Sequence, residues 1–417
     1  MQNRHCLGAK IAAAVAFAAL TLHGPAARAE FPTLERAIQM GRERAIMVVE
    51  AEGELGVANA QMTGARQSAI GNPYTDVQVD RGWNGGTTGT VQALTFTYIP
   101  IDIAGQRGKR IEEAEKLIGW RKQGVTDARA IAIGSVVAAY GEVVVGNARV
   151  VAAVNGEQNA REEAKYFAGR LEAKDTTIYE KSLADAEVAR WVQSRAEAAL
   201  RVTAAKARFD QLIGGGGHDA PPADVVITPP SLRGSWDDAY LAKMAAHAPI
   251  IVRLQREREY WHASTDRYKR EVIQPVSLEV LAGHGSLGEA RFGLGAVITF
   301  PITRRFQGEI ARGEAGVSNA DRQLGLYHTI VESRLRAARD AFVAVVKAVE
   351  EVDKSGMPAL ERAVSASQEA YKLGKIELQR ALLAKRDLAL AVARRLDLLE
   401  AAWRAYADLV ILSGDLP

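Results

Sequence analysis

The sequence has almost no cysteine: Cys6 is the only one among 417 residues. It lies before the apolar part of the N-terminal segment, where a lipid-attachment cysteine would not stand. One cysteine cannot form a disulfide within the chain, and it offers no cysteine cluster for zinc. We therefore expect a protein without disulfides and without a lipid anchor.

Aromatic residues are also scarce. They make up 6% of a chain that is 48% hydrophobic, so Ala, Val and Leu supply most of the apolar content. This composition is typical of long helices and coiled coils rather than of a compact enzyme. The body of the chain also lacks a run of 18 apolar residues, which predicts that no helix spans a membrane.

Motifs that carry chemistry are missing as well. The sequence contains no GxSxG, no HExxH and no Cys-His arrangement. The glycine run at 214–217 is not followed by the Lys-Ser/Thr of a phosphate-binding loop. We therefore expect no catalytic residues and no cofactor. We also expect no metal site, because no two of the histidines that follow residue 29 stand four residues apart: His218, His247, His262, His284 and His328.

The N-terminal segment has the pattern of a secretory signal. Arg4 and Lys10 precede or flank the apolar stretch 11–22, and Ala27-Arg28-Ala29 forms an A-x-A cleavage site. A retained anchor is the alternative, but 12 apolar residues are too few to span a bilayer. Removal of residues 1–29 would leave 50 of the 53 basic residues against 50 acidic ones. The formal charge of +3 thus belongs to the leader, and nucleic acid is not an expected partner.

One corner occurs twice in the remaining chain. TYIPIDIAGQRGKRIEEAE (97–115) and ITFPITRRFQGEIARGEAG (298–316) both run from β-branched and aromatic residues through a proline and a basic turn into an Ala/Glu/Arg helix. Pro100 matches Pro301, and Ala114 matches Ala315, each 201 positions later. Such self-similarity at a nearly fixed offset indicates an internal repeat.

Further matches extend the repeat in both directions. Segment 34–38 matches 236–240, 72–73 matches 274–275, and 139–140 matches 341–342, each at an offset of 202, while Gly169 matches Gly374 at 205. We predict a tandem duplication after the signal peptide (1–29). Its parts are a first repeat (30–213), a Gly/Pro linker (214–235) and a second repeat (236–417).

Each repeat is predicted to begin with one helix, from about Thr33 to Gly71 and from Trp236 to Ile273. Two strands follow, then a long helix, from Gly105 to about Ala168 and from Gln307 to Leu373. About 60 residues at 1.5 Å each make a helix of roughly 90 Å, a length that antiparallel coiled coils use. Each long helix is expected to turn near a glycine into a return helix that ends near Ile213 or Leu412.

The predicted strands show period-two patterning. Val77 and Val79 alternate with Asp76, Gln78 and Asp80. Similar alternation runs through 275–281 and 291–300, and Leu94, Phe96 and Tyr98 share one face of their strand. The loops 84–90 and 284–289 would join the strands into two hairpins. Lengths of about 9–11 residues, with one apolar and one polar face, are typical of transmembrane β-strands.

Four strands cannot close a barrel, because about eight are needed. A small soluble sheet packed on helices is therefore one alternative. The other is a barrel whose wall is shared by several chains. An uncovered four-stranded sheet would expose its edges and favour aggregation.

With these features, the sequence resembles the TolC family of outer membrane efflux proteins over the whole chain after the leader. The resemblance rests on the duplicated layout, the two corners, the LERAI and GNP segments (34–38 and 71–73) and the hairpin ends YFAGRLEA and YKLGKIEL (166–173 and 371–378). It implies a mainly α protein with membrane β-strands. A homotrimer would share a 12-stranded barrel, four strands per chain, above a tunnel of long coiled-coil helices.

The resemblance also implies a place and partners. The chain would lie in the outer membrane of a Gram-negative bacterium, in contact with its lipid, and extend into the periplasm. It would dock a periplasmic adaptor (a membrane fusion protein) and an inner-membrane pump, and it would not be an enzyme. Small-molecule or metal-ion efflux is the favoured function. Type I protein secretion is the alternative, and a periplasmic coiled-coil adaptor or scaffold is a further one.

Site residues follow from the resemblance at the tips of the helix hairpins. These tips would contact the adaptor and close the channel through Gly169, Arg170, Leu171, Leu373, Gly374, Lys375 and Ile376. A simpler interpretation is that both glycines only allow the hairpins to turn. Nearby acids could form a three-fold ring that favours cations, and the candidates are Glu377, Glu369 and Asp175. Solvated surface acids are the alternative.

Overall fold

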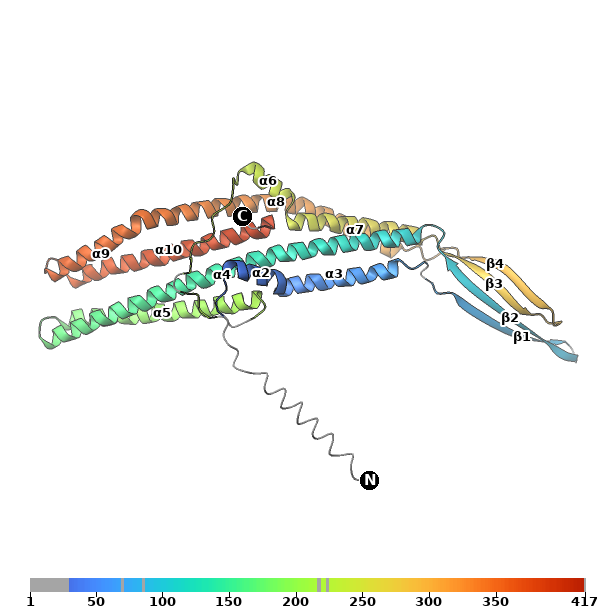
Figure 1. Cartoon of the computed structure of the whole chain (residues 1–417), viewed down its shortest axis with the longest axis horizontal. Coiled ribbons are helices and arrows are strands. Elements are labelled where there is room, and N and C mark those ends of the chain that lie inside the picture. The colour runs from blue at the N-terminus through green and yellow to red at the C-terminus, as the bar shows by residue number, and fades with distance from the viewer. Residues whose placement is uncertain (1–29, 69–70, 85–86, 216–218, 223–224, 416–417) are drawn as a thin grey trace, which may run out of the picture. The chain divides into compact units, whose positions relative to one another are not determined.

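The computed structural model describes residues 30–415 apart from 69–70, 85–86, 216–218 and 223–224. The predicted signal peptide lies outside the described residues. The chain is mostly helical, with one four-stranded sheet (Figure 1). In chain order the elements are α2 (Leu34–Arg44), α3 (Ile46–Ala65), β1 (Tyr74–Asn84), β2 (Thr87–Ile101), α4 (Gln106–Glu172), α5 (Ile178–Leu212), α6 (Asp238–Ala246), α7 (Pro249–Glu271), β3 (Val276–His284), β4 (Ala290–Ile298), α8 (Gln307–Glu351), the π-helical turn η1 (Val352–Gly356), α9 (Met357–Lys372) and α10 (Leu378–Ser413).

The predicted first helix of each repeat is wrong in one respect, because each is broken into two. Ala45 separates α2 from α3 with an extended backbone (φ −60°, ψ 133°), although no proline stands there. In the second repeat His247 and Ala248 separate α6 from α7, and Pro249 occupies the first turn of α7. Proline suits that position because its fixed φ is helical and its missing N–H has no helical partner to lose.

The long helices follow the prediction more closely. The 67 residues of α4 form one helix, which at 1.5 Å per residue is about 100 Å long. The second long helix is not continuous. The 45 residues of α8 lead into η1, which has wider π-helical turns just before Pro358 in α9. Proline cannot donate a backbone hydrogen bond to the preceding turn, so a local change in helix winding is expected at this position.

One stretch of α4 is long and apolar enough to cross a membrane by length and composition alone. It differs in this respect from the expectation that no such stretch exists. However, 67% of that stretch is buried within the protein, which is the behaviour of a helix packed among other helices.

The chain divides into two compact units. The first consists of the described part of Met1–Ala45, with Ser135–Pro230 and Ala341–Ala407. It holds two helix hairpins, formed by the end of α4 with α5 and by α9 with α10 (Figure 1). Its core contains an aromatic cluster in which Phe31 lies 5.3 Å from Tyr140 and 5.5 Å from Phe209, and Tyr140 lies 5.8 Å from Trp403, measured between ring centroids.

Two glycines of α4 make room for tryptophans in this unit. A Cβ added at Gly141 would lie 2.3 Å from Cγ of Trp403, and one added at Gly156 would lie 2.4 Å from Cε3 of Trp191. The indole N–H of Trp403 donates to the carbonyl oxygen of Ile227 at 2.9 Å. A residue of the predicted linker is thus fixed to the helical core.

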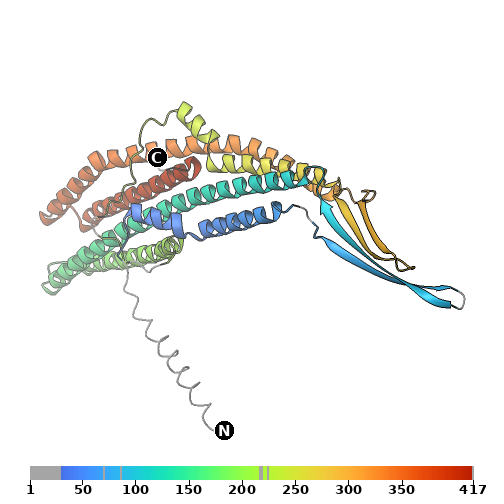
Figure 2. The ribbon, with the colours of Figure 1, turned by 45° about the vertical axis from the view of Figure 1, so that its right-hand side comes forward.

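The second unit consists of Ile46–Gly134, Ser231–Asp340 and the described part of Asp408–Pro417. It contains α3, α7, the first parts of α4 and α8, and the sheet, whose strands continue from the ends of these helices (Figure 2). The sheet is antiparallel throughout, in the order β1-β2-β3-β4. The predicted hairpins are therefore present, although β2 has 15 residues and begins within the predicted loop 84–90.

Candidate functional site

The sheet has two different faces, which the strand register defines. Tyr98 pairs with Tyr74 on one side and with Glu279 on the other, and Glu279 pairs with Gly295. Directly paired residues lie on the same face of a sheet. One face therefore carries Tyr74, Asp76, Gln78, Leu94, Phe96, Tyr98, Ser277, Glu279, Leu281, Gly293, Gly295 and Val297. The opposite face carries Thr75, Val77, Val79, Thr95, Thr97, Ile99, Val276, Leu278, Val280, Phe292, Leu294 and Ile298.

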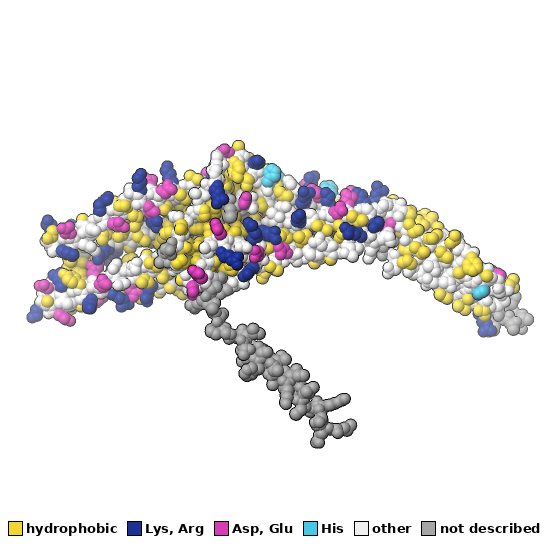
Figure 3. All heavy atoms as spheres, viewed as in Figure 1, with side chains coloured by type: hydrophobic (Ala, Val, Ile, Leu, Met, Phe, Trp, Pro, Cys, Tyr) yellow, Lys and Arg dark blue, Asp and Glu magenta, His cyan; other side chains and the backbone are white. Residues whose placement is uncertain are grey.

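The second of these faces is apolar and exposed. Phe292 is 83% exposed and Leu294 is 80% exposed. Hydrophobic side chains cover much of the visible surface over the strands, whereas Lys, Arg, Asp and Glu lie mainly over the helices (Figure 3). A continuous apolar surface of this kind in one chain indicates a binding surface for lipid or protein.

The other face is polar but also aromatic, and Leu94, Phe96 and Tyr98 share it, as predicted for these three residues. Phe96 and Tyr98 lie on the same face as Asp76 and Glu279, so they are not part of the apolar face. The ring of Tyr98 lies 4.7 Å from that of Tyr74 and 6.5 Å from that of Phe96. Alternation alone could not assign β2, because both of its faces contain hydrophobic residues and only pairing with its neighbours decides.

The two outer strands have unpaired edges. Within the described residues, β1 pairs only with β2, and β4 pairs only with β3. Each outer strand therefore offers a row of backbone N–H and C=O groups that another strand can pair with.

A buried group of charges lies where β2 passes into α4. The Arg110 side chain is only 5% exposed, and its guanidinium lies 2.6 Å from a carboxylate oxygen of Asp102 and 3.4 Å from one of Glu271. It also donates to the carbonyl oxygen of Gln67 at 3.2 Å. Both carboxylates are 8% exposed, and Glu271 also lies 3.6 Å from Arg267, so this buried group contains further compensating charge. The ion pairs of Arg110 fix the strand end against α4 and α7.

The two hairpin tips share one backbone arrangement. The amide of Lys174 donates to the carbonyl of Leu171, and that of Asp175 donates to the carbonyl of Arg170. In the second tip Gly374 and Lys375 donate in the same way, to Tyr371 and Ala370. Both are Schellman turns, with Lys174 and Gly374 in the left-handed conformation (φ 59° and 69°).

This geometry corrects the predicted role of Gly169. Gly169 lies inside α4, which continues to Glu172, and the turn is made by Lys174 instead. Gly374 does occupy the turn, as predicted. The structurally equivalent residues are therefore Lys174 and Gly374, and the match of Gly169 with Gly374 at an offset of 205 was five residues out of register.

Contacts near the tips join the two hairpins of the first unit. Phe167 and Ala184 form a buried cluster with Leu378 and Leu382, which belong to the other hairpin. The hydroxyl of Tyr371 accepts from a guanidinium N–H of Arg170 and donates to Glu180, both at 3.4 Å.

Two ion pairs continue this connection further along the hairpins. Lys385 lies 2.8 Å from Glu163, and Arg386 lies 3.1 Å from Glu187. Apolar packing, hydrogen bonds and ion pairs thus all connect the first hairpin to the second.

Arg170 is the predicted tip residue with a contact across the hairpins. It also donates to the backbone oxygen of Asp175 at 2.5 Å. Leu171 and Ile376 are half-buried, and the remaining predicted tip residues, Gly169, Leu373, Gly374 and Lys375, are exposed.

The three candidate acids, Asp175, Glu369 and Glu377, are exposed, and no described basic side chain forms an ion pair with them. Glu369 lies in the last turns of α9, where its carbonyl accepts from Leu373. Glu377 directly precedes α10, and its carbonyl accepts from the amide of Arg380. In the part of the chain that the structure describes, no three His, Cys, Asp or Glu side chains form a group that could hold a metal ion.

Glu180 and Tyr371 were missed by the sequence reasoning. Glu180 closes a capping box with Thr177 at the start of α5 and accepts from the hydroxyl of Thr176. That hydrogen bond lowers the pKa of Glu180 below its ordinary value. The T-x-x-E spacing 177–180 was a signal for this position, since it marks a helix start. No sequence signal indicated Tyr371, because its partners come from another hairpin.

Known proteins match this chain in structure and not in sequence. No protein-family model and no curated protein sequence matches it. The outer membrane protein VceC from Vibrio cholerae is 15% identical, with a TM-score of 0.72 over 91% of this chain and 96% of that one. The CmeC outer membrane channel of Campylobacter jejuni is 14% identical, with a TM-score of 0.73 over 91% and 85%.

The open state of the MtrE outer membrane channel of Neisseria gonorrhoeae is 18% identical, with a TM-score of 0.65 over 92% of this chain and 89% of that one. At these identities the likeness is one of fold. It extends over about nine-tenths of the chain and includes both the sheet and the helices.

Proposed function

We propose that this chain, which has the fold of the TolC-family outer membrane channels, is the outer-membrane exit duct of a tripartite efflux system. The coarser part of the predicted fold class, long helices with a small antiparallel sheet, agrees with these structural matches. The duct itself would be passive and would hold neither a catalytic residue nor a cofactor. Cargo would reach it from an inner-membrane pump through a periplasmic adaptor.

The sheet is the observation that carries this proposal. It has four strands, two unpaired edges and an apolar face on which Phe292 and Leu294 are almost fully exposed. Such a sheet is not stable alone in water, and four strands are too few for a barrel. Three copies would supply 12 strands, with β1 of one copy paired to β4 of the next.

The two faces of the sheet support the same arrangement. The face with Phe292 and Leu294 would contact lipid, and the face with Asp76 and Glu279 would line the water-filled interior. The helices would then extend from the outer membrane into the periplasm. An N-terminal export signal agrees with this location.

The hairpin tips are the proposed contact with the adaptor and the proposed gate. Leu373 is 62% exposed at its tip although it is apolar, as expected of a residue that a partner covers. The other proposed contact residues are those named above for the two tips. Asp175, Glu369 and Glu377 remain candidates for an acid ring, since three copies would repeat each carboxylate around one axis.

Hydrogen bonds through Tyr371 would hold the gate closed. Replacing Tyr371 by Phe removes the hydroxyl that connects Arg170 with Glu180 and leaves the ring in place. We expect the single-channel conductance in planar bilayers to rise. Tyr179→Phe is the matched control, because Tyr179 is 59% exposed in the same region and its hydroxyl makes no hydrogen bond to a described residue. Equal conductance of both variants and the parent would contradict the gate assignment.

The proposed cargo is a small molecule or a metal ion, with type I protein secretion as the alternative. A deletion strain separates them. Greater sensitivity to drugs or metal salts, restored by the gene, would support the first, whereas loss of a secreted protein without such sensitivity would support the second.

The first test of the whole proposal is the mass of the protein extracted from fractionated membranes. We expect a trimer that requires detergent and comes from the outer-membrane fraction. A monomer released without detergent would contradict the duct and favour a periplasmic adaptor or scaffold with a soluble sheet.

A further inference from the structure

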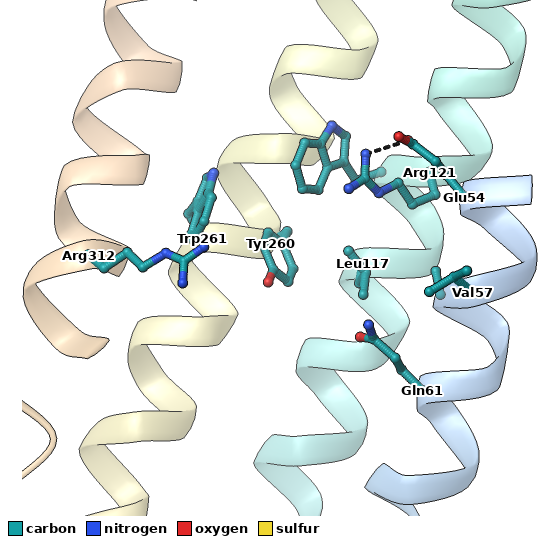
Figure 4. A pocket seen from close by; sticks show the side chains of 10 residues that line it. Glu54, Val57, Gln61, Leu117, Arg121, Tyr260, Trp261 and Arg312 are labelled. Carbon is teal, nitrogen blue, oxygen red and sulfur yellow. Dashed lines mark hydrogen bonds and ion pairs between the residues drawn. The ribbon is translucent and has the colours of Figure 1, made fainter. Parts of the chain in front are cut away.

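A cleft lies in the helical part of the second unit, and no strand residue lines it (Figure 4). Its volume is about 330 Å³, and four helices of the same chain form it: α3, α4, α7 and α8. This volume is at the lower end of the range for small-molecule sites, roughly 300–1,000 Å³. The proposed function does not use it.

The walls of the cleft are aromatic and aliphatic. Three neighbouring rings form one side: the ring of Tyr260 lies 5.2 Å from that of Trp120 and 5.0 Å from that of Trp261. Leu117 of α4 and Val57 of α3 face them (Figure 4). Flat rings beside branched side chains leave a slot that suits a planar, apolar body.

The charges at the cleft are not balanced. Glu54 and Arg121 form an ion pair at 2.7 Å, and the Arg121 guanidinium lies 4.3 Å from the centre of the Trp120 ring. Arg312 also lines the cleft, with its guanidinium 5.8 Å from the centre of the Trp261 ring (Figure 4). No described carboxylate forms an ion pair with Arg312, so the lining carries one uncompensated positive charge.

Hydrogen-bond donors accompany this charge. Burial, with a smaller contribution from the nearby Glu113, raises the pKa of the Tyr260 hydroxyl, which therefore stays protonated. No described residue makes a hydrogen bond with that hydroxyl. The amide of Gln61 also lines the cleft, beside Leu117 and on the side away from Arg312 (Figure 4). A guanidinium, a phenol and an amide can all donate to an anionic oxygen.

We propose that this cleft binds an amphipathic organic anion: a planar aromatic body in the slot formed by Tyr260, Trp261 and Leu117, with its carboxylate or sulfonate at Arg312. The rings would supply most of the affinity through apolar contact. Arg312 would supply the preference for an anion over a neutral molecule of the same shape.

An adjoining chamber of about 540 Å³ explains why the anionic group is assigned to Arg312. It shares Gln61, Leu117 and Tyr260 with the first chamber and is lined by Arg110 and Arg267. Both of those arginines already have carboxylate partners: Asp102 and Glu271 for Arg110, and Glu113 and Glu271 for Arg267. They attract a further anion less than Arg312 does, and the second chamber offers room for a polar tail.

Two probes of nearly the same shape test the proposal on the full mature protein in detergent. One is 1-anilinonaphthalene-8-sulfonate, and the other is N-phenyl-1-naphthylamine, which has the same rings without the sulfonate. Binding is followed by energy transfer from tryptophan, because Trp120 and Trp261 line the cleft. We expect Arg312→Gln to weaken binding of the sulfonate about tenfold, the loss expected for one hydrogen bond to a charged group, and to leave the neutral probe unchanged.

Two further variants make the outcome decisive. Arg322→Gln removes an exposed arginine from the same helix outside the cleft and should change neither probe. Val57→Phe fills the slot from a position that is 62% exposed without adding a tryptophan donor, and should abolish the energy transfer for both probes beyond the micelle background. Equal sulfonate affinity of Arg312→Gln and Arg322→Gln, or energy transfer that survives in Val57→Phe, would overturn the proposal.

Discussion

The two halves of the chain place a left-handed residue at the same two turns, but they give the glycine to opposite turns. At the corner between strand and long helix, the first half has Gly105 (φ 72°) and the second has Phe306 (φ 55°). At the hairpin tip, the first half has Lys174 (φ 59°) and the second has Gly374 (φ 69°). The hydrogen-bond pattern of a turn is thus kept even where the side chain makes it unfavourable, since left-handed backbone costs an L-residue about 1–2 kcal/mol.

The corners differ more strongly in how they are held. Gln106 and Gln307 play the same local part: each side-chain oxygen accepts from the backbone N–H two residues earlier, at 2.8 and 3.0 Å. Only the first corner adds a buried ion group around Arg110. The residue 201 positions after Arg110 is Ala311. Local turn chemistry is therefore common to both halves, and the buried ion group is specific to the first.

The largest expected effect on stability comes from removing the buried ion group of the first corner. Arg110→Leu would leave Asp102 and Glu271 buried without their cation, which typically costs about 3–5 kcal/mol. Arg304→Leu at the second corner removes a side chain that is 77% exposed and should cost no more than about 0.5 kcal/mol. Apparent melting temperatures in detergent compare the two, and equal values would refute the unequal fixation of the corners.

A smaller effect is expected at the second tip. Gly374→Lys places a side chain on left-handed backbone and should destabilise the turn by about 1 kcal/mol. Hydrogen exchange of the Lys375 amide, which donates to Ala370, should become faster. Gly169→Ala should act in the opposite direction, because Gly169 lies in a helix with free space around it and alanine favours helix by about 1 kcal/mol. Destabilisation by both changes would mean that Gly169 has a role outside its helix.

Lys174→Gly is the reciprocal change at the first tip. It relieves the left-handed strain but increases the freedom of the unfolded chain, so a net gain of about 0.5 kcal/mol is expected. The amide of Asp175, which donates to Arg170, should exchange more slowly. Faster exchange would show that the Lys174 side chain stabilises the tip more than its backbone strain costs.

The smallest effect depends on pH and distinguishes the starts of the two return helices. The pKa of Glu180 is lowered, chiefly by the hydrogen bond from Thr176, so the folded state favours the carboxylate. Its contribution is present above the ordinary pKa of a glutamate and is lost as the pH falls through the lowered pKa. Exchange at the start of α5 should increase there, and Glu180→Gln should remove this pH dependence while α10 is unaffected.

Much of the fold could be predicted because its signals are local. The Pro-containing corners, the long proline-free helices and the alternating strands each lie within a short stretch of sequence. The break at Ala45 could not be predicted, since neither proline nor glycine stands there. The faces of β2 needed the register with β3, because Phe96 and Ile99 are both hydrophobic and lie on opposite faces.

The residues of the hairpin tips were harder to predict from the sequence, because their signals are not local. Glycine is the usual signal of a left-handed turn, so Lys174 gave none and Gly169 attracted the assignment. Tyr371 forms hydrogen bonds with Arg170 and Glu180, which lie 201 and 191 positions before it in the sequence. No local pattern specifies contacts at such a separation. Residues that connect two hairpins across such sequence separations can be identified only from the packed structure.

The unpaired edges of β1 and β4 also bear on how the protein is made. The helical hairpins of a newly exported chain contact one another within that chain through buried apolar residues and ion pairs. The strands of that chain have no such cover: until other copies or lipid cover Leu294 and its neighbours, they are the part that aggregates. The yield of assembled protein should therefore be limited by an association step, and overproduction of the chain will accumulate protomers whose helices are folded and whose strands are not.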